Sequence, residues 1–294
     1  MQGIHLKGLG VAMITPFKQD GTIDYAALSH LTDHLLQNGV DYLVVLGTTG
    51  ETPALSPEEQ KAITQAVVSQ VKGQVPIVLG VSSNCTQTVV QNLKTGDFTG
   101  IDAILSVVPY YNKPTQEGIY LHYKHLAAAT PLPVVMYNVP GRTGMNMTAE
   151  TTLRIARECP NVIAVKEASG DRDQIGRILR DKPAGFQVIS GDDALTLELI
   201  GAGATGVISV IGNAFPQQFG QMVHLALSGD YVQAQTIHQQ LTELYELLFT
   251  DGSPAGVKSM LHRMGFVENV LRLPLVPVQA ATNEKIRKAL ISLE

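Results

Sequence analysis

Short apolar runs, many of them rich in β-branched residues, recur along this chain, and each is followed by a longer amphipathic stretch. The eight runs are 10–17, 42–47, 76–82, 103–109, 133–140, 162–169, 186–192 and 206–212. From the first run to the eighth there are seven steps of about 28 residues, which suits a strand, a crossover helix and two short loops. Repeated units of this kind predict a parallel sheet, and eight of them close a (β/α)8 barrel.

The strand-like runs are apolar almost throughout, which fits burial on both faces. A doubly wound open sheet is the alternative fold. After the eighth unit, three more helical patterns follow at 231–249, 253–266 and 278–293. A barrel of about 250 residues is common as a single domain. We therefore expect an α/β fold, with a (β/α)8 barrel over 1–230 and a C-terminal appendage of three helices over 231–294.

Composition restricts the partners and the location of the protein. Charged residues make up 16% of the chain and the net charge is −5, so no basic face indicates nucleic acid as a partner. No apolar stretch reaches the roughly 20 residues that span a bilayer, and residues 1–17 do not resemble a signal peptide. We expect a soluble, cytoplasmic protein without a membrane partner. Cys85 and Cys159 show no paired or metal-binding spacing, and we predict no disulfide.

Lys166 ends the apolar run that starts at Val162. An amine at the end of a buried strand is partly desolvated, which disfavours its charged form and lowers its pKa. The free amine can attack a carbonyl to form a Schiff base. Lys166 is therefore a candidate nucleophile. The alternative is a lysine that extends to solvent or pairs with the neighbouring Glu167.

Three motifs fall at the carboxyl ends of other predicted strands, where barrel enzymes place their active sites. The second strand ends in a Gly-Thr-Thr-Gly turn, residues 47–50, whose amides and hydroxyls can bind an anion. The fourth and fifth strands end beside Tyr110, Tyr111 and Tyr137, and a phenol can move protons during imine chemistry. Each motif also has a purely structural interpretation, since such turns are common and tyrosines often pack at the ends of barrels.

Charged residues near the same end of the predicted barrel have more than one interpretation. Arg142 lies in a Pro-Gly loop and offers a planar fork for a carboxylate or phosphate, or else forms a surface ion pair. Asp192 and Asp193 follow the seventh strand, where their charge argues against phosphate. They are candidate metal ligands, but the sequence supplies no histidine or further acidic cluster beside them. We therefore expect no metal and no organic cofactor.

Four segments together resemble the dihydrodipicolinate synthase family, also called 4-hydroxy-tetrahydrodipicolinate synthases, of the pyruvate-dependent class I aldolases. In the family's order, the segments are Gly-Thr-Thr-Gly-Glu at 47–51, Tyr-Tyr-Asn-Lys-Pro at 110–114, Tyr-Asn-Val-Pro-Gly-Arg-Thr at 137–143 and Val-Lys-Glu-Ala at 165–168. The resemblance covers nearly the whole chain. It implies a lyase in lysine and diaminopimelate biosynthesis that condenses pyruvate with L-aspartate 4-semialdehyde and then cyclises the product.

The resemblance also implies roles for individual residues. Lys166 would form the Schiff base with pyruvate, Tyr137 would donate and accept protons, and Thr49 would relay them. Tyr111 would complete the relay from a neighbouring subunit, which implies a homo-oligomer, typically a tetramer built as a dimer of dimers. The remaining implied residues bind substrate or line the pocket, and they are Thr48, Thr49, Arg142, Gly191 and Ile208.

The chain departs from the family where many members bind inhibitory lysine. Asn84 and Tyr110 fit that site, but Pro57 and Gln60 replace histidines, and Thr88 replaces a glutamate that binds the effector's amine. We therefore expect weak or absent inhibition by lysine.

Two alternative functions have discriminating features. An N-acetylneuraminate lyase or sugar-acid aldolase shares the lysine and the tyrosine, but it usually differs in the two-threonine turn and in the Pro-Gly-Arg-Thr loop. A non-catalytic barrel that binds a keto acid would need to form no imine.

Overall fold

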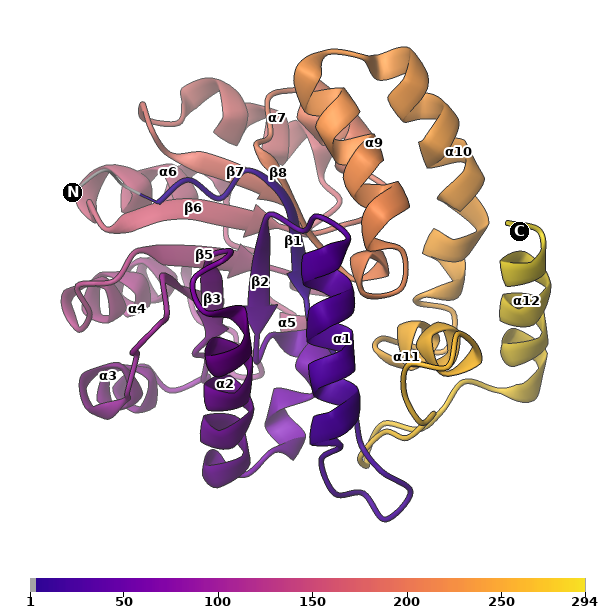
Figure 1. Ribbon diagram of the computed structural model, residues 1–294. Helices are drawn as coiled ribbons and strands as arrows, with labels where there is room; N and C mark the ends of the chain where they lie inside the picture. The colour runs from indigo at the N-terminus through magenta and orange to yellow at the C-terminus, as the bar shows by residue number, and fades with distance from the viewer. Residues whose placement is uncertain (1–3, 294) are drawn as a thin grey trace.

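The computed structural model describes residues 4–293 and contains a closed barrel of eight parallel strands (Figure 1). Each strand pairs with its neighbours in chain order, and β8 closes the barrel against β1. The strands are β1 Gly8–Ala12, β2 Tyr42–Val45, β3 Ile77–Gly80, β4 Ala103–Val107, β5 Val134–Asn138, β6 Val162–Glu167, β7 Gln187–Ser190 and β8 Gly206–Ser209. The predicted (β/α)8 barrel is confirmed, and the open sheet is wrong.

Helices surround the barrel and continue beyond it. The helices are α1 Tyr25–Gln37, α2 Pro57–Val71, α3 Thr86–Thr95, α4 Gln116–Ala128, α5 Pro140–Thr143, α6 Ala149–Glu158, α7 Arg172–Asp181, α8 Thr196–Gly201, α9 Pro216–Ser228, α10 Tyr231–Leu247, α11 Ala255–Arg263 and α12 Ala280–Ile291. Three short 3-10 helices are η1 Thr48–Gly50, η2 Thr52–Ala54 and η3 Ile211–Asn213. None of the helices within residues 4–293 is both long and apolar enough to cross a membrane.

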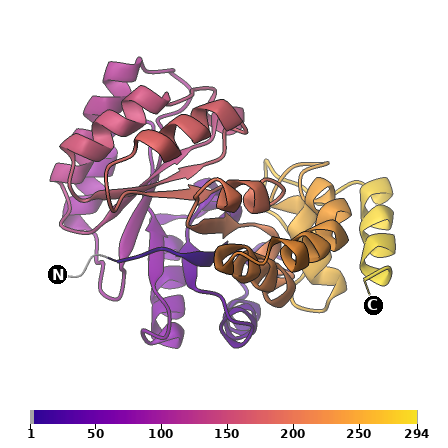
Figure 2. The same cartoon turned by 90° about the horizontal axis from the view of Figure 1, so that it is seen from above.

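The last three helices form the predicted C-terminal appendage. α10 packs against α9, and α12 packs against both α10 and α11. Figure 2 shows these helices together on one side of the barrel, with the C-terminus at the outer edge. The predicted range 1–230 begins at residues 1–3 and the predicted range 231–294 ends at residue 294; these four residues lie outside the described residues.

The first strand differs from its prediction. It was expected over 10–17, but it begins at Gly8 and ends at Ala12. The segment beyond Ala12 leaves the sheet because Ile14 donates its N–H to Oδ1 of Asn213 at 3.2 Å, and Pro16 has no N–H to donate. The other seven strands begin within one residue of their predicted starts but end two or three residues earlier. Those final predicted residues form the loops that carry the candidate site.

Two layers of apolar side chains hold the barrel together. One lies between strands and helices, and the other fills the inside of the barrel. Inside, the hydroxyl of Tyr42 donates to the carbonyl oxygen of Val207 at 3.0 Å. Around the outside, Ser56 caps the start of α2: its hydroxyl accepts from the N–H of Glu59, and its own N–H donates to the Glu59 carboxylate. The packed interior thus gives a rigid base for the loops at the strand ends.

Candidate active site

Lys166 lies near the end of β6 on the inward face of the barrel. Side chains alternate between the faces of a strand, so Lys166 shares its face with Ala164, which packs inside the barrel. Only 5% of Lys166 is exposed. Burial lowers the pKa of its ammonium group to about 7, with Asp193 opposing the decrease and Arg142 adding to it. A substantial fraction of Lys166 is therefore the free amine at neutral pH.

The neighbouring Glu167 faces away from the barrel interior and has its own partners. Its carboxylate accepts hydrogen bonds from the side-chain amide of Asn138 at 3.1 Å, the backbone N–H of Ser169 at 2.9 Å and the side-chain amide of Gln174 at 3.2 Å. Glu167 is fully buried by these contacts. The alternative in which Lys166 extends to solvent or pairs with Glu167 is therefore wrong.

Tyr137 stands beside Lys166 in the register of β5 and β6. The ammonium nitrogen of Lys166 lies 4.4 Å from the centroid of the phenol ring. Desolvation raises the pKa of Tyr137, while Arg142 and the hydroxyl of Thr48 act to lower it. The phenol is therefore protonated at neutral pH, and its hydroxyl can donate or accept a proton next to the amine.

The turn Gly47–Gly50 follows β2 and is held at both ends by hydroxyl groups. Thr15 Oγ1 donates to the carbonyl oxygen of Gly50 at 2.7 Å, and Thr52 Oγ1 donates to that of Gly47 at 3.0 Å. Thr49 is 5% exposed, whereas Thr48 is exposed and lies against the phenol of Tyr137. The turn thus brings at least one of the two predicted threonine hydroxyls to the tyrosine that adjoins Lys166.

Gly191 occupies a position where a side chain would collide with Ala168 and crowd Lys166. A Cβ atom on Gly191 would stand 3.1 Å from Cε of Lys166 and 2.7 Å from Cβ of Ala168. Ile208, on β8, is 1% exposed and belongs to the apolar cluster inside the barrel. The absent side chain of Gly191 therefore leaves room beside the lysine, and Ile208 contributes to the apolar interior that the lysine shares.

Asp193 is the acidic group that acts on Lys166, a role that the sequence did not reveal. Its Oδ2 accepts from the backbone N–H groups of Val210 at 3.1 Å and Ile211 at 2.8 Å. Burial raises the pKa of Asp193 to about 6, while its hydrogen bonds oppose the increase. Its Oδ1 has no hydrogen-bond partner in the part of the chain that the structure describes. The only sequence signal for this role is the position of Asp193 at the end of the seventh predicted strand, two residues after Gly191.

Metal binding by Asp192 and Asp193 finds no support in their surroundings. Among residues 4–293, no group of three or more histidine, cysteine, aspartate or glutamate side chains is arranged to hold a metal ion. Asp192 instead accepts a hydrogen bond from the backbone N–H of Ala194 at 2.9 Å. The two carboxylates thus serve local backbone structure, and Asp193 also supplies negative charge near the amine.

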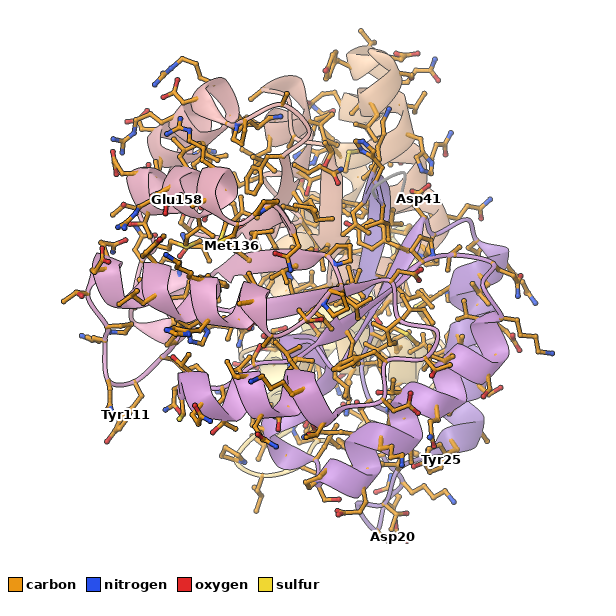
Figure 3. The ribbon with its side chains drawn as sticks, turned by 90° about the vertical axis from the view of Figure 1, so that its left-hand side faces the viewer. Asp20, Tyr25, Asp41, Tyr111, Met136 and Glu158 are labelled. Atoms are coloured by element: carbon orange, nitrogen blue, oxygen red, sulfur yellow. The ribbon has the colours of Figure 1, made fainter. Side chains whose placement is uncertain are left out.

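The structure brings Arg142 to the site but does not bring Tyr111. Arg142 lies in the short helix α5, is exposed, and acts electrostatically on both Lys166 and Tyr137. Tyr111 has φ 74° and is 82% exposed. Figure 3 shows its side chain projecting from the edge of the molecule into open space. Within one chain, the site therefore combines a buried amine, a phenol, a hydroxyl turn and a guanidinium group.

Comparison with known proteins places this geometry in a family. The profile of the dihydrodipicolinate synthetase family matches residues 5–293. A 4-hydroxy-tetrahydrodipicolinate synthase from Parabacteroides distasonis is 66% identical over 293 residues, which cover 100% of this chain and 99% of the relative.

Solved structures agree with the sequence comparison. A structure described as the first monomeric dihydrodipicolinate synthase variant has a TM-score of 0.95 and 41% identity, over 98% of this chain and 96% of that one. The chloride-inhibited dihydrodipicolinate synthase from Acinetobacter baumannii, in complex with pyruvate, has a TM-score of 0.95 and 37% identity, over 98% of this chain and 99% of that one.

Proposed function

Since the chain belongs to the dihydrodipicolinate synthetase family, we propose that Lys166 forms the Schiff base of its reaction. The reaction is the class I aldol condensation of pyruvate with L-aspartate 4-semialdehyde, followed by cyclisation, in lysine and diaminopimelate biosynthesis. A class I aldolase uses a lysine in place of a cofactor. The observation that carries the proposal is the buried amine of Lys166, with its pKa lowered to about 7, beside the phenol of Tyr137.

The first half of the reaction attaches pyruvate to the enzyme. The free amine of Lys166 adds to the keto carbon, and Tyr137 donates a proton to the carbonyl oxygen, which becomes a hydroxyl. Loss of that hydroxyl as water leaves a protonated imine. Removal of a proton from the methyl carbon then gives an enamine. The ring of Tyr137 is close enough to Lys166 to serve these steps through its hydroxyl.

The second half makes the new carbon–carbon bond. The enamine carbon attacks the aldehyde carbon of the semialdehyde, and the aldehyde oxygen takes up a proton. Arg142, exposed at the rim of the site, is suited to the semialdehyde's carboxylate through its planar fork of donors. The amine of the substrate then displaces Lys166 from the imine carbon, which closes the ring and frees the enzyme.

Supporting residues bind pyruvate and relay protons. Thr48 and Thr49 present hydroxyls in a turn with free amides, which suits the pyruvate carboxylate. Thr49 relays protons toward Tyr137 through the same turn. Gly191 and Ile208 line the pocket, and the missing side chain at Gly191 leaves the space that pyruvate needs next to the amine.

A homo-oligomer, a tetramer built as a dimer of dimers, is part of the proposal. Tyr111 extends away from its own chain and is 82% exposed, which supports a role in the site of a second copy. We propose that it completes the proton relay there. The division into a catalytic barrel over 1–230 and an appendage over 231–294 belongs to the same proposal.

Weak or absent inhibition by lysine also belongs to the proposal. The side-chain amide of Gln60 donates to the backbone carbonyls of Thr52 and Leu55, so it is occupied within the chain. Pro57 begins α2 and has no polar side chain to offer an effector. An inhibition curve measured with lysine tests this point, and a half-inhibitory concentration well below millimolar contradicts it.

Borohydride reduction in the presence of pyruvate, followed by mass spectrometry, tests the central proposal. We expect a pyruvate-derived mass increment on the peptide that contains Lys166, none in Lys166→Ala, and consumption of aspartate semialdehyde by the native protein. Lys182→Ala is the matched control, because that lysine is half-buried and its ammonium group donates to the carbonyl oxygen of Phe186. No adduct on folded protein contradicts the Schiff-base mechanism. An adduct without consumption of the semialdehyde indicates a sister aldolase.

A further inference from the structure

The C-terminal appendage reaches the active-site turn through a buried ion pair. The ammonium group of Lys258, on α11, donates to Oε1 of Glu51 at 2.5 Å and to the carbonyl oxygen of Val270 at 2.9 Å. The side chains of Lys258 and Glu51 are 0% and 1% exposed. Glu51 directly follows the turn Gly47–Gly50. The appendage is therefore joined to the segment that carries Thr48 and Thr49.

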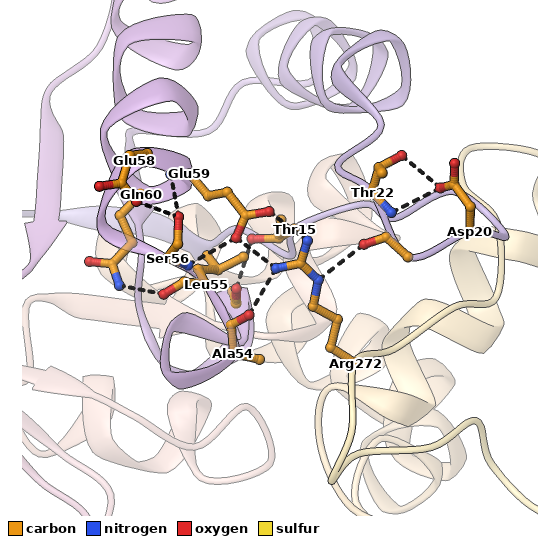
Figure 4. Close-up of polar contacts among 12 residues, drawn as sticks. Thr15, Asp20, Thr22, Ala54, Leu55, Ser56, Glu58, Glu59, Gln60 and Arg272 are labelled. Atoms are coloured by element: carbon orange, nitrogen blue, oxygen red, sulfur yellow. Dashed lines mark hydrogen bonds and ion pairs between the residues drawn. The ribbon is translucent and has the colours of Figure 1, made fainter.

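Arg272 makes a second connection between the same two regions. Its backbone N–H donates to Oε2 of Glu51 at 3.1 Å. Its guanidinium group donates to both carboxylate oxygens of Glu59, at 2.7 and 2.6 Å, and to the carbonyl oxygen of Ala54 at 2.8 Å (Figure 4). We call the four side chains of Glu51, Glu59, Lys258 and Arg272 the clasp. It holds the segment between Glu51 and Glu59 from the appendage side.

The backbone of Glu51 closes the turn, and its side chain belongs to the clasp. Glu51 has φ 54°, in the left-handed region that non-glycine residues seldom adopt. In this conformation its N–H donates to the carbonyl oxygen of Thr48 at 3.2 Å, which closes the turn. Such a conformation persists only where surrounding contacts hold it. The contacts of Glu51 with Lys258 and Arg272 supply that restraint.

A buried ion pair between the appendage and the turn is not needed for stability alone. Desolvating two charges offsets much of their attraction, so well-packed apolar residues in the same place are often as stable or more so. What charge and hydrogen bonds add is a fixed geometry, because each carboxylate oxygen of Glu51 has its own donor. The ring of Phe17 lies under both cations, 4.3 Å from the Lys258 nitrogen and 4.6 Å from the Arg272 guanidinium carbon.

We infer that Lys258 is a positioning residue for the reaction, acting through Glu51 to fix the turn that presents Thr48 and Thr49. The inference rests on the proposed roles of those threonines. The appendage would then contribute to catalysis, because Lys258 on α11 fixes the geometry of the turn at 47–50, which belongs to the barrel.

The test compares turnover per competent site in Lys258→Met and Glu51→Gln. Competent sites are counted as the fraction of chains that borohydride traps at saturating pyruvate, which removes any loss from unfolding. A shift of the turn by about 1 Å is expected to lower kcat per trapped site by about 100-fold, because misplacement of catalytic groups is that costly. If Lys258→Met does not fold, Glu51→Gln carries the test, since it keeps the acceptor for Arg272 but removes the charge.

Ile286→Ala is the matched control for a merely structural effect. Ile286 is fully buried in α12, which packs on α10 and α11, and it is not part of the clasp. We expect this variant to lose stability but to keep native kcat per trapped site. The inference is overturned if both clasp variants turn over within twofold of native per trapped site, or if Ile286→Ala falls as far as they do. Failure of the native protein to be trapped contradicts the proposed function instead.

Discussion

Two lysines are buried among residues 4–293, and their surroundings differ. Lys258 has a carboxylate at 2.5 Å and a carbonyl oxygen at 2.9 Å. Lys166 takes part in none of the ion pairs of the described residues, and its side-chain nitrogen lies over the ring of Tyr137. Burial lowers the pKa of both, to about 8 for Lys258, where Glu51 opposes the decrease, and to about 7 for Lys166.

The comparison shows how one residue type serves two purposes. A nucleophilic amine needs a low pKa and a free lone pair, so a close carboxylate would work against it. A positioning lysine needs to remain charged and to have every donor directed, and Lys258 is charged at neutral pH. At Lys166 the fold accepts the cost of a buried, unpaired cation. At Lys258 it offsets that cost with partners.

The largest expected effect comes from breaking the paired site. Lys258→Met leaves Glu51 as a buried carboxylate without its cation, and the loss of one partner of such a pair costs about 3–5 kcal/mol. Chemical denaturation should show this decrease in the free energy of unfolding. In Lys258→Met combined with Glu51→Gln, much of the loss should be recovered, because no unpaired charge remains. Equal losses in the single and double variants contradict this account.

The opposite result is expected at the unpaired site. Lys166→Met removes a buried cation that has no ion-pair partner, so the free energy of unfolding at pH 6 should rise by about 1–3 kcal/mol while activity is lost. The pKa of Lys166 is lower in the folded state, about 7, than its usual 10.5. Below pH 7 the native protein therefore carries the full cost of the buried charge, and the cost disappears as pH rises to 10.5.

Denaturation curves of the two proteins at several pH values measure this trade-off. The advantage of Lys166→Met over the native protein should be greatest at pH 6 and should shrink between pH 7 and pH 10.5. If Lys166→Met instead has a lower free energy of unfolding than the native protein at pH 6, the charged amine of Lys166 has stabilising partners, as that of Lys258 has.

The unpaired site was largely predictable from the sequence, whereas the paired one was not. Lys166 and Tyr137 each end an apolar run, and consecutive strands of a barrel pair in chain order, so their proximity follows from the repeat. Lys258 lies 207 residues from Glu51, in a helix whose pattern indicates only an amphipathic segment. Nothing local marks such a contact, because the packing of the appendage on the barrel decides it.

Two other features also depend on tertiary structure. The sequence offers Asp193 as a candidate metal ligand beside Asp192, yet the buried Asp193 carboxylate accepts from the backbone N–H groups of Val210 and Ile211, at the start of η3. The first strand is predicted to extend to residue 17, but it ends at Ala12. The backbone N–H of Ile14 donates to the side chain of Asn213, 199 residues away, instead of to a neighbouring strand, and periodicity does not reveal such a contact. Side chains that come from distant strands and bond to backbone thus limit what a repeat can predict.

The pH dependence of imine formation reports whether Lys166 differs from an ordinary lysine. Only the free amine attacks pyruvate, so the rate of trapping should rise about tenfold per pH unit below pH 7 and level off above it, as a group with a pKa of about 7 requires. Measuring trapping between pH 5.5 and pH 9 with a fixed amount of reductant tests this. A rate that continues to rise to pH 9 indicates an amine with an ordinary pKa, which would make the two buried lysines alike.

The smallest expected effect is a shift in the midpoint of the trapping profile in Asp193→Asn but not in Asp192→Asn. Asp193 raises the pKa of Lys166, so Asp193→Asn should move the midpoint of the trapping profile to lower pH, by about one unit or less. Asparagine keeps a side-chain oxygen for the N–H groups of Val210 and Ile211, so the loop should remain in place. Asp192→Asn is the matched control, because Asp192 bonds to Ala194 and is not among the charges that act on Lys166. Equal midpoint shifts in both variants would indicate a general effect of net charge. A shift in Asp193→Asn alone would identify Asp193 as the charge that raises the pKa of Lys166.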